Sequence, residues 1–199
     1  MNVAYNADCL AAMREMPDKA FDLAVVDPPY GIGISSNPVR QAHERKSWDN
    51  SIPTKEYFEQ LFRVSKSQII WGGNYYDLPP TQNLIVWDKQ QPEDFSLAMC
   101  EFAWCSIQRP AKIFRYSVLT EKGKIHPTQK PVALYRWIYQ HYAKPGGKIL
   151  DTHLGSGSSR IAAYDAGLGF VGYEIDETYF RLQEERFARH TSQMSLFID

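Results

Sequence analysis

The stretch ILDTHLGSGSSR, residues 149–160, decides the fold class. An apolar run ends at Asp151, a glycine-rich turn follows, and a helix-forming segment begins at Ser158. Gly155 and Gly157 allow the backbone to approach a ligand closely, and the start of a helix offers backbone N–H groups to it. The stretch therefore predicts a strand, a ligand-binding turn and a helix, which is one unit of an α/β protein.

An acidic residue ends the next expected strand, FVGYEID (170–176). Glu174 lies where a carboxylate would accept hydrogen bonds from ribose hydroxyls, so the unit favours a nucleoside ligand. A dinucleotide fingerprint would place a third glycine at position 160, where this chain has Arg160. This departure argues against an NAD(P) oxidoreductase.

Strand-like and helix-like segments alternate along the rest of the chain, which predicts an α/β fold with a mainly parallel central sheet and helices on both faces. Thr54 is the expected cap of one helix, and Gly167 the expected end of another. The expected strands are 2–8, 21–26, 68–73, 83–89, 100–107, 147–151 and 170–176, and the expected helices are 9–16, 55–65, 132–142, 158–167 and one from about 177.

Chemically useful residues gather at the carboxyl ends of these strands. Ligands of parallel α/β sheets bind beyond those ends, so the residues should share one rim. They are Asp8, Asp27, the WGGNYY turn at 71–76, Asp151 and Glu174.

The tetrapeptide DPPY, residues 27–30, follows the buried run FDLAVV and is unusually stiff. Pro28 and Pro29 have fixed φ angles and no N–H, and Asp27 precedes a proline and is held extended. The motif therefore holds a carboxylate, a backbone carbonyl and the Tyr30 ring at a strand end.

Bulk properties predict a single domain, 1–199, with a normal core: 199 residues, 44% hydrophobic, net charge −1. The three cysteines lack metal-ligand spacing, which predicts reduced thiols, a cytoplasmic location and no metal. Neither a signal peptide nor a membrane span is expected. Two irregular stretches, 31–52 and 108–125, interrupt the pattern, and cations cluster within 109–130.

Four motifs occur in one order: DPPY (27–30), HPTQKP (126–131), DTHLGSGS (151–158) and GYEID (172–176). The chain thereby resembles the β-group of S-adenosylmethionine-dependent DNA amino-methyltransferases, in which the catalytic motif precedes the cofactor motif. The resemblance implies a circularly permuted Rossmann-like methyltransferase fold and S-adenosylmethionine as cofactor. The permutation makes the last strand a neighbour of the N-terminal strand.

The resemblance also implies roles for individual residues. Asp27, Pro28, Pro29 and Tyr30 would form the catalytic motif. The methionine end of the cofactor would meet the 126–131 segment, with Lys130 facing its carboxylate. The implied cofactor-binding set is Asp8, Asp27, His126, Thr128, Lys130, Asp151, Gly155, Gly157, Ser158 and Glu174.

The chemistry of DPPY fits transfer to an exocyclic amine, whose lone pair is delocalised into the base. Asp27 and the Pro28 carbonyl can each accept one amine hydrogen, which aims the lone pair at the methyl group. A base in a duplex must be flipped out to reach the site, and Tyr30 would stack on it. In the family, Asp at the first motif position is typical of adenine N6 and Ser of cytosine N4, so Asp27 favours adenine without excluding cytosine.

Other readings stay open from sequence: an RNA or protein-amide methyltransferase, and a binding module on a degenerate fold. The chain also departs from the family pattern. Thr152, His153 and Leu154 replace the usual Pro, aromatic and variable residues, so an aromatic contact to the cofactor is expected to be missing. No separate recognition domain is evident, so segments 31–52 and 108–125 are expected to face double-stranded DNA. So small a domain contacts little DNA alone, which makes a homodimer plausible.

Overall fold

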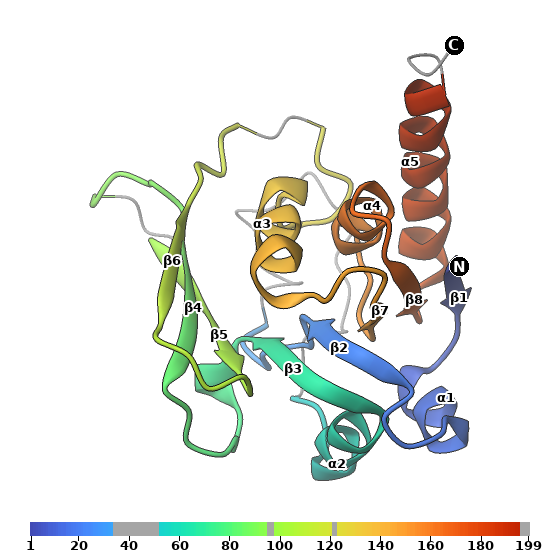
Figure 1. Cartoon of the computed structure of the whole chain (residues 1–199). Helices are drawn as coiled ribbons and strands as arrows, with labels where there is room; N and C mark the ends of the chain where they lie inside the picture. Colours follow the sequence, from blue (N-terminus) through green and yellow to red (C-terminus); the bar gives the residue numbers. More distant parts are fainter. Residues whose placement is uncertain (34–51, 95–97, 121–122, 196–199) are drawn as a thin grey trace.

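One eight-stranded sheet organises the molecule in the computed structural model, which describes residues 1–33, 52–94, 98–120 and 123–195 (Figure 1). The strands are β1 (Asn2–Asn6), β2 (Phe21–Val26), β3 (Ser65–Trp71), β4 (Asn83–Asp88), β5 (Cys100–Cys105), β6 (Lys112–Arg115), β7 (Lys148–Asp151) and β8 (Gly169–Glu174). The helices are α1 (Cys9–Glu15), α2 (Lys55–Val64), the 3-10 turn η3 (Gly73–Tyr75), α3 (Val132–Tyr142), α4 (Ser158–Asp165) and α5 (Glu177–Ser195).

The strand order is β1-β8-β7-β2-β3-β5-β4-β6, and within the described ranges β5 alone runs antiparallel to its neighbours. The α/β class and the mainly parallel sheet are thus confirmed. β8 pairs with β1 in parallel, with Val171 opposite Val3, so the last strand lies beside the first. This neighbourhood is the one that the permuted motif order predicts.

Helices cover both faces of the sheet: α3 and α4 lie on one side, and α1 and α2 on the other (Figure 1). β2 shows why its sequence is apolar throughout. Leu23 and Val25 join the core that contains α3 and α4, whereas Ala24 and Val26 join the core beneath α2. A strand buried on both faces needs a continuous apolar run rather than an alternating one.

Local signals placed most element ends correctly. The Thr54 hydroxyl caps α2 by accepting from the Tyr57 N–H at 3.3 Å, and Gly167 ends the α4 segment with a φ of 65°. Two elements differ from expectation. β3 begins at Ser65, directly after α2, and the stretch 108–125 contains strand β6. β6 pairs with β4 in parallel, and the sequence of its four residues does not by itself predict this long-range pairing.

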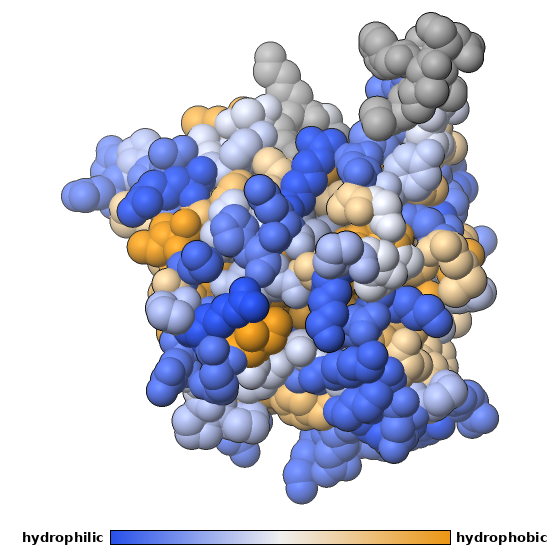
Figure 2. All heavy atoms as spheres, in the orientation of Figure 1, coloured by the Kyte–Doolittle hydropathy of each residue, from blue (hydrophilic) through white to orange (hydrophobic). Residues whose placement is uncertain are grey.

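Figure 2 shows a mostly hydrophilic face in the orientation of Figure 1, with a hydrophobic patch on the left over β4 and β6. Exposed apolar side chains on these strands include Leu84 and Ile113. Among the described residues, no helix combines the length and the apolar character needed to cross a membrane.

Candidate active site

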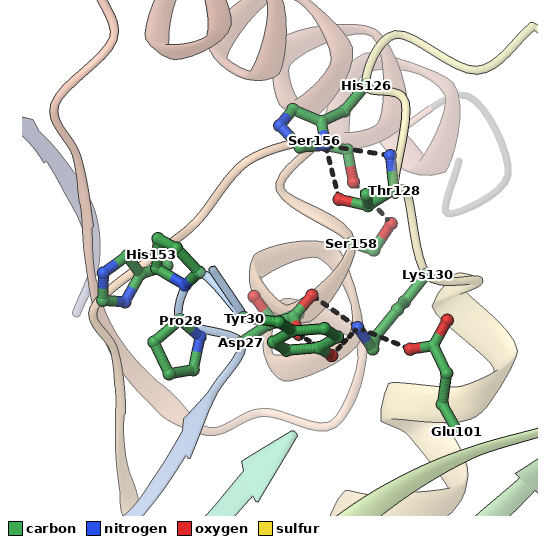
Figure 3. Close-up of polar contacts among 12 residues, drawn as sticks. Asp27, Pro28, Tyr30, Glu101, His126, Thr128, Lys130, His153, Ser156 and Ser158 are labelled. Carbon is green, nitrogen blue, oxygen red and sulfur yellow. Dashed lines mark hydrogen bonds and ion pairs between the residues drawn. The ribbon is translucent and has the colours of Figure 1, made fainter. Parts of the chain in front are cut away.

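The expected rim is present at the carboxyl ends of adjacent strands. β8, β7 and β2 are neighbours in the sheet, and their ends carry Glu174, Asp151 and Asp27. The HPTQKP segment, which leads into α3, meets the same edge, because its Lys130 reaches Asp27 (Figure 3). Motifs that lie far apart in the sequence are therefore brought together.

Tyr76 and Gly72, in the 72–76 turn, hold the DPPY tetrapeptide in place. The Tyr76 hydroxyl lies 2.8 Å from the Pro28 carbonyl oxygen and 3.0 Å from that of Pro29. Tyr30 packs so tightly on Gly72 that a Cβ there would lie 2.3 Å from the tyrosine ring, and Gly72 has a φ of 69°. The turn thus needs glycine both for its backbone and for the ring it supports.

Tyr30 also makes two contacts that bear on its expected role. Its hydroxyl donates to Asp27 Oδ1 at 2.6 Å. Its ring stacks on that of Tyr75, with centroids 5.0 Å apart and planes inclined by 17°. A base that is to stack on this face of Tyr30 must therefore displace Tyr75.

Lys130 lies at the centre of the polar cluster (Figure 3). Its Nζ donates to Asp27 Oδ2 at 2.5 Å and to the Tyr30 hydroxyl at 3.2 Å, and it pairs with Glu101 Oε2 at 3.0 Å. The residue is 3% exposed. These partners all belong to the protein itself, and the contact with the cofactor carboxylate that the resemblance implies stays a prediction.

The charges of this cluster control one another. Burial raises the pKa of Asp27, and Lys130 opposes that rise. Burial alone would lower the pKa of Lys130, but Asp27 and Glu101 outweigh it and the pKa is raised. Burial likewise acts to raise the pKa of Glu101, but Lys130 and Lys89 bring it down to about 2. Lys130 is thus a cation shared by two largely buried carboxylates, and it opposes the rise in pKa that burial imposes on each.

The glycine-rich turn connects to the acid at the end of β8. Gly155 and Gly157 have φ angles of 51° and 73°, and Gly157 caps the start of α4. Glu174 Oε2 accepts from the Gly155 N–H at 2.8 Å, and Oε1 accepts from the Asp176 N–H at 2.9 Å. The carboxylate is thereby fixed at the turn where a ribose would lie.

The HPTQ segment packs on this turn. The His126 ring lies 3.7 Å from the position of a Cβ on Gly155 and meets Tyr179 edge-on. Its Nδ1 accepts from the Thr128 N–H at 3.3 Å and lies 3.1 Å from the Thr128 hydroxyl. The Ser158 hydroxyl lies 3.1 Å from that of Ser156.

Two of the expected cofactor-binding acids have internal roles. Asp151 is 2% exposed and accepts from the Ser159 hydroxyl and from the His153 N–H, and burial raises its pKa to about 7. Asp8 caps α1 by accepting from the Leu10 N–H at 2.8 Å. Their expected contacts with a cofactor stay predictions.

His153 occupies the position where the family usually has an aromatic residue. Burial lowers its pKa to about 4, so the imidazole is neutral at pH 7. The ring meets Tyr57 edge-on at 5.4 Å, and its Nδ1 lies 3.0 Å from the Thr152 hydroxyl. A neutral imidazole ring therefore occupies this position, and the expected loss of an aromatic contact to the cofactor stays a prediction.

Two residues of the site were not singled out from sequence: Glu101 and Lys89. Lys89 Nζ pairs with Glu101 Oε1 at 2.6 Å. Lys89 directly follows β4, and Glu101 lies on β5, which runs antiparallel to β4. The sequence signal for this pair is a lysine and a glutamate on two strands, and it becomes visible only once the β4–β5 register is known.

The residues present fit S-adenosylmethionine. The turn offers backbone N–H groups at the start of α4, and the fixed Glu174 carboxylate suits ribose hydroxyls. Thr128 and His126 add polar groups beside Gly155. These groups therefore suit the nucleoside part of the cofactor and place further polar groups beside it.

Comparisons with known proteins agree with this geometry. A family model described as DNA methylase matches residues 65–185. The type II methyltransferase M.HinfI of Haemophilus influenzae is 24% identical over an alignment 244 positions long, which covers 94% of this chain and 68% of that protein. The M1.HpyAVI–SAM complex has a TM-score of 0.65 at 19% identity, covering 94% of this chain and 100% of that one. The cytosine-N4-specific PvuII DNA methyltransferase has a TM-score of 0.64 at 13% identity, covering 96% and 91%.

The family match spans more than half of the chain, and the solved structures share its Rossmann-like fold. The chain belongs to the N6/N4 DNA methylase family and is an S-adenosylmethionine-dependent DNA methyltransferase.

Proposed function

We propose that the enzyme methylates the exocyclic N6 amine of adenine in double-stranded DNA, on a base flipped out of the duplex. The observation that carries this proposal is Asp27, a carboxylate held in one orientation by Tyr30 and Lys130 beside the Pro28 carbonyl. A rigid acceptor pair at a strand end is what an exocyclic amine requires.

The two acceptors act on the two amine hydrogens. Asp27 accepts a hydrogen bond from one amine hydrogen. The Pro28 carbonyl oxygen accepts a hydrogen bond from the other, with the lone pair that the Tyr76 hydroxyl does not use. The nitrogen lone pair then leaves the ring plane and points at the methyl donor. When bound, S-adenosylmethionine supplies a methyl group that is already activated by its sulfonium centre. The protein contributes mainly orientation, and the amine proton leaves readily once the nitrogen is alkylated.

Tyr30 supports the flipped base in this proposal. Aromatic stacking contributes roughly 1–3 kcal/mol per base, which offsets much of the cost of unstacking. Tyr75 covers a face of Tyr30 and is 43% exposed, so it is the ring that the base replaces.

The cofactor roles are proposed for Thr128, His126, Gly155, Gly157, Ser158 and Glu174, with Asp8, Asp27, Lys130 and Asp151 at the same edge. The adenosine end meets the glycine-rich turn and Glu174. The methionine end meets the HPTQ segment, whose contact with Gly155 closes the site.

Glu174→Gln is expected to weaken cofactor binding by about tenfold or more, because a charge-assisted hydrogen bond contributes roughly 1.5–3 kcal/mol. The affinity for S-adenosylmethionine is measured by titration calorimetry on the folded variant. Glu177→Gln, at the start of α5, is the matched control and should bind normally. Unchanged affinity in Glu174→Gln would remove the ribose contact from the proposal.

The DNA-facing surface is proposed to include the described parts of 31–52 and 108–125. Residues 34–51 and 121–122 lie outside the described residues. Within 108–120, cations lie on or just before the edge strand β6: Arg109, Lys112 and Arg115. Such contacts contribute salt-dependent affinity rather than sequence choice. A homodimer would extend this surface, and light scattering tests it.

Cytosine N4 is the second candidate, since the PvuII enzyme with the same fold is cytosine-N4-specific. Both amines present two hydrogens to the same acceptors. The test incubates the enzyme with S-adenosylmethionine and DNA from a methylation-free host and then analyses nucleosides by mass. N6-methyladenine is expected. N4-methylcytosine would keep the mechanism and change the base, and methylation of RNA or protein alone would overturn DNA as substrate.

A further inference from the structure

A row of alternating charges extends from the catalytic carboxylate into the sheet. Lys130 Nζ is 2.5 Å from Asp27 and 3.0 Å from Glu101, and Glu101 is 2.6 Å from Lys89 Nζ. Figure 3 shows Lys130 reaching between Asp27 and Glu101. The four formal charges sum to zero, so the row can be largely buried without a surplus charge.

Glu101 and Lys89, the two residues of this row farthest from Asp27, are held by the pairing of β4 with β5. Glu101 lies on β5 opposite Trp87 of β4, and the Lys89 N–H extends the same ladder by donating to the Met99 carbonyl at 2.9 Å. Lys89 is 8% exposed, and the Glu101 side chain is 24% exposed. A carboxylate paired on a strand is a firmer support than one on a loop.

Lys130 needs such a support because a lysine ammonium sits on a flexible four-carbon stem. Asp27 alone would let the ammonium follow the carboxylate. With Glu101 on the other side, and with the Trp71 ring 5.1 Å from Nζ, the ammonium has one preferred position. Asp27 Oδ2 is then fixed from outside the DPPY loop, while Tyr30 fixes Oδ1 from within it.

We propose that Glu101, held by Lys89, is a positioning residue that fixes the Lys130 ammonium against Asp27 and thereby fixes the acceptor geometry that the target amine meets. The proposal rests on the role of Asp27 in the proposed function. It assigns to β5, the antiparallel strand, a part in aligning the methyl acceptor.

Glu101→Gln is the central test, measured as single-turnover methyl transfer with saturating DNA and cofactor. The rate should fall by roughly 10- to 100-fold, as a misplacement of about 1 Å would cause. Affinity for S-adenosylmethionine should be unchanged. Glu59→Gln, on the exposed face of α2, is the matched control and should keep the wild-type rate.

The pH profile separates positioning from a merely structural role. The negative charge of Glu101 raises the pKa of Asp27, so its removal should move the acidic limb of the rate profile to lower pH. Glu101→Asp keeps the charge and shortens the side chain, so its rate of methyl transfer should fall while the acidic limb of the profile stays in place. This variant replaces Glu101→Gln as the test if Glu101→Gln does not fold. The charged and titratable groups near Asp27 are Lys130, Glu101, Tyr30, Asp151 and Tyr135, and Glu101 alone changes in the test.

Lys89 provides a second, independent arm. If Lys89 acts through Glu101, the single variant Lys89→Met lowers the rate of methyl transfer. The double variant with Glu101→Gln is then no slower than Glu101→Gln by itself. Additive losses would show that Lys89 acts elsewhere and would overturn its part in the proposal.

The outcomes are distinguishable from a failure of the proposed function. Wild-type methylation that is lost in Asp27→Ala but retained in Glu101→Gln overturns the positioning role alone. A slow Glu101→Gln with an unmoved acidic limb and a lowered melting temperature also overturns it, since that result is structural. Loss of DNA methylation in every form, wild type included, instead overturns the proposed function.

Discussion

Asp27→Ala is expected to lower the single-turnover rate of methyl transfer by roughly 10²- to 10³-fold, the loss typical of removing one preorganised group from a transition state. The variant removes the acceptor for one amine hydrogen, and Lys130 loses the closer of its two carboxylate partners and keeps Glu101. Cofactor affinity should change far less than the rate, because the glycine-rich turn and Glu174 are untouched. Rapid-quench assays and calorimetry measure the two quantities.

Asp27→Asn is the informative companion variant. It keeps one acceptor oxygen and loses the charge that pairs with Lys130. A rate between those of wild type and Asp27→Ala would show that charge and geometry both contribute. A wild-type rate in Asp27→Ala would contradict the catalytic assignment altogether, whatever the product on DNA.

Local sequence signals were sufficient where the structure is decided locally. The continuous apolar run of β2, the Thr54 cap and the glycine-rich turn each have a short-range cause, and the structure has all three. The meeting of Asp27, Asp151 and Glu174 at one edge also followed, because parallel strands present their carboxyl ends together.

The partners of individual side chains did not follow from sequence. Lys130 lies in a motif that points to a cofactor carboxylate, and that motif gave no sign that its ammonium also contacts Asp27 and Glu101. Glu101 lies in the run CEFAWC, which predicts a strand but not the partner of its carboxylate, and its contact with Lys89 depends on the β4–β5 register. Strand β6 was missed for the same reason, since a four-residue segment that begins with Lys112 and ends with Arg115 acquires strand structure by pairing with β4.

His153 shows a subtler limit. The family usually has an aromatic residue at this position, so His153 suggested a lost aromatic contact to the cofactor. The residue type alone does not say whether a histidine is charged near neutral pH. Burial keeps the imidazole neutral, with a pKa of about 4, so it resembles the aromatic ring it replaces. Environment, rather than residue identity, decides which chemistry the position offers.

The largest effect on stability is expected for Lys130→Met, a change of similar volume that removes the charge. It leaves Asp27 and Glu101 facing each other without the cation between them, although Lys89 still pairs with Glu101. Breaking a buried ion pair by removing one partner typically costs about 3–5 kcal/mol. The free energy of unfolding, measured in urea, should fall by that amount at neutral pH. Lys66→Met, which breaks the exposed pair with Asp22, should cost less than about 1 kcal/mol.

The pH dependence of the Lys130→Met deficit gives the sharper test. Without Lys130, burial dominates, and the pKa of Asp27 in the folded protein rises further above its unfolded value. Such a group stabilises the fold while it is protonated, and that stability is lost as pH rises through the folded pKa. The deficit relative to wild type should therefore be small in acid and grow towards neutral pH. A deficit of equal size across that range would mean that Lys130 stabilises the fold by packing against Trp71 and Tyr30 rather than by its charge.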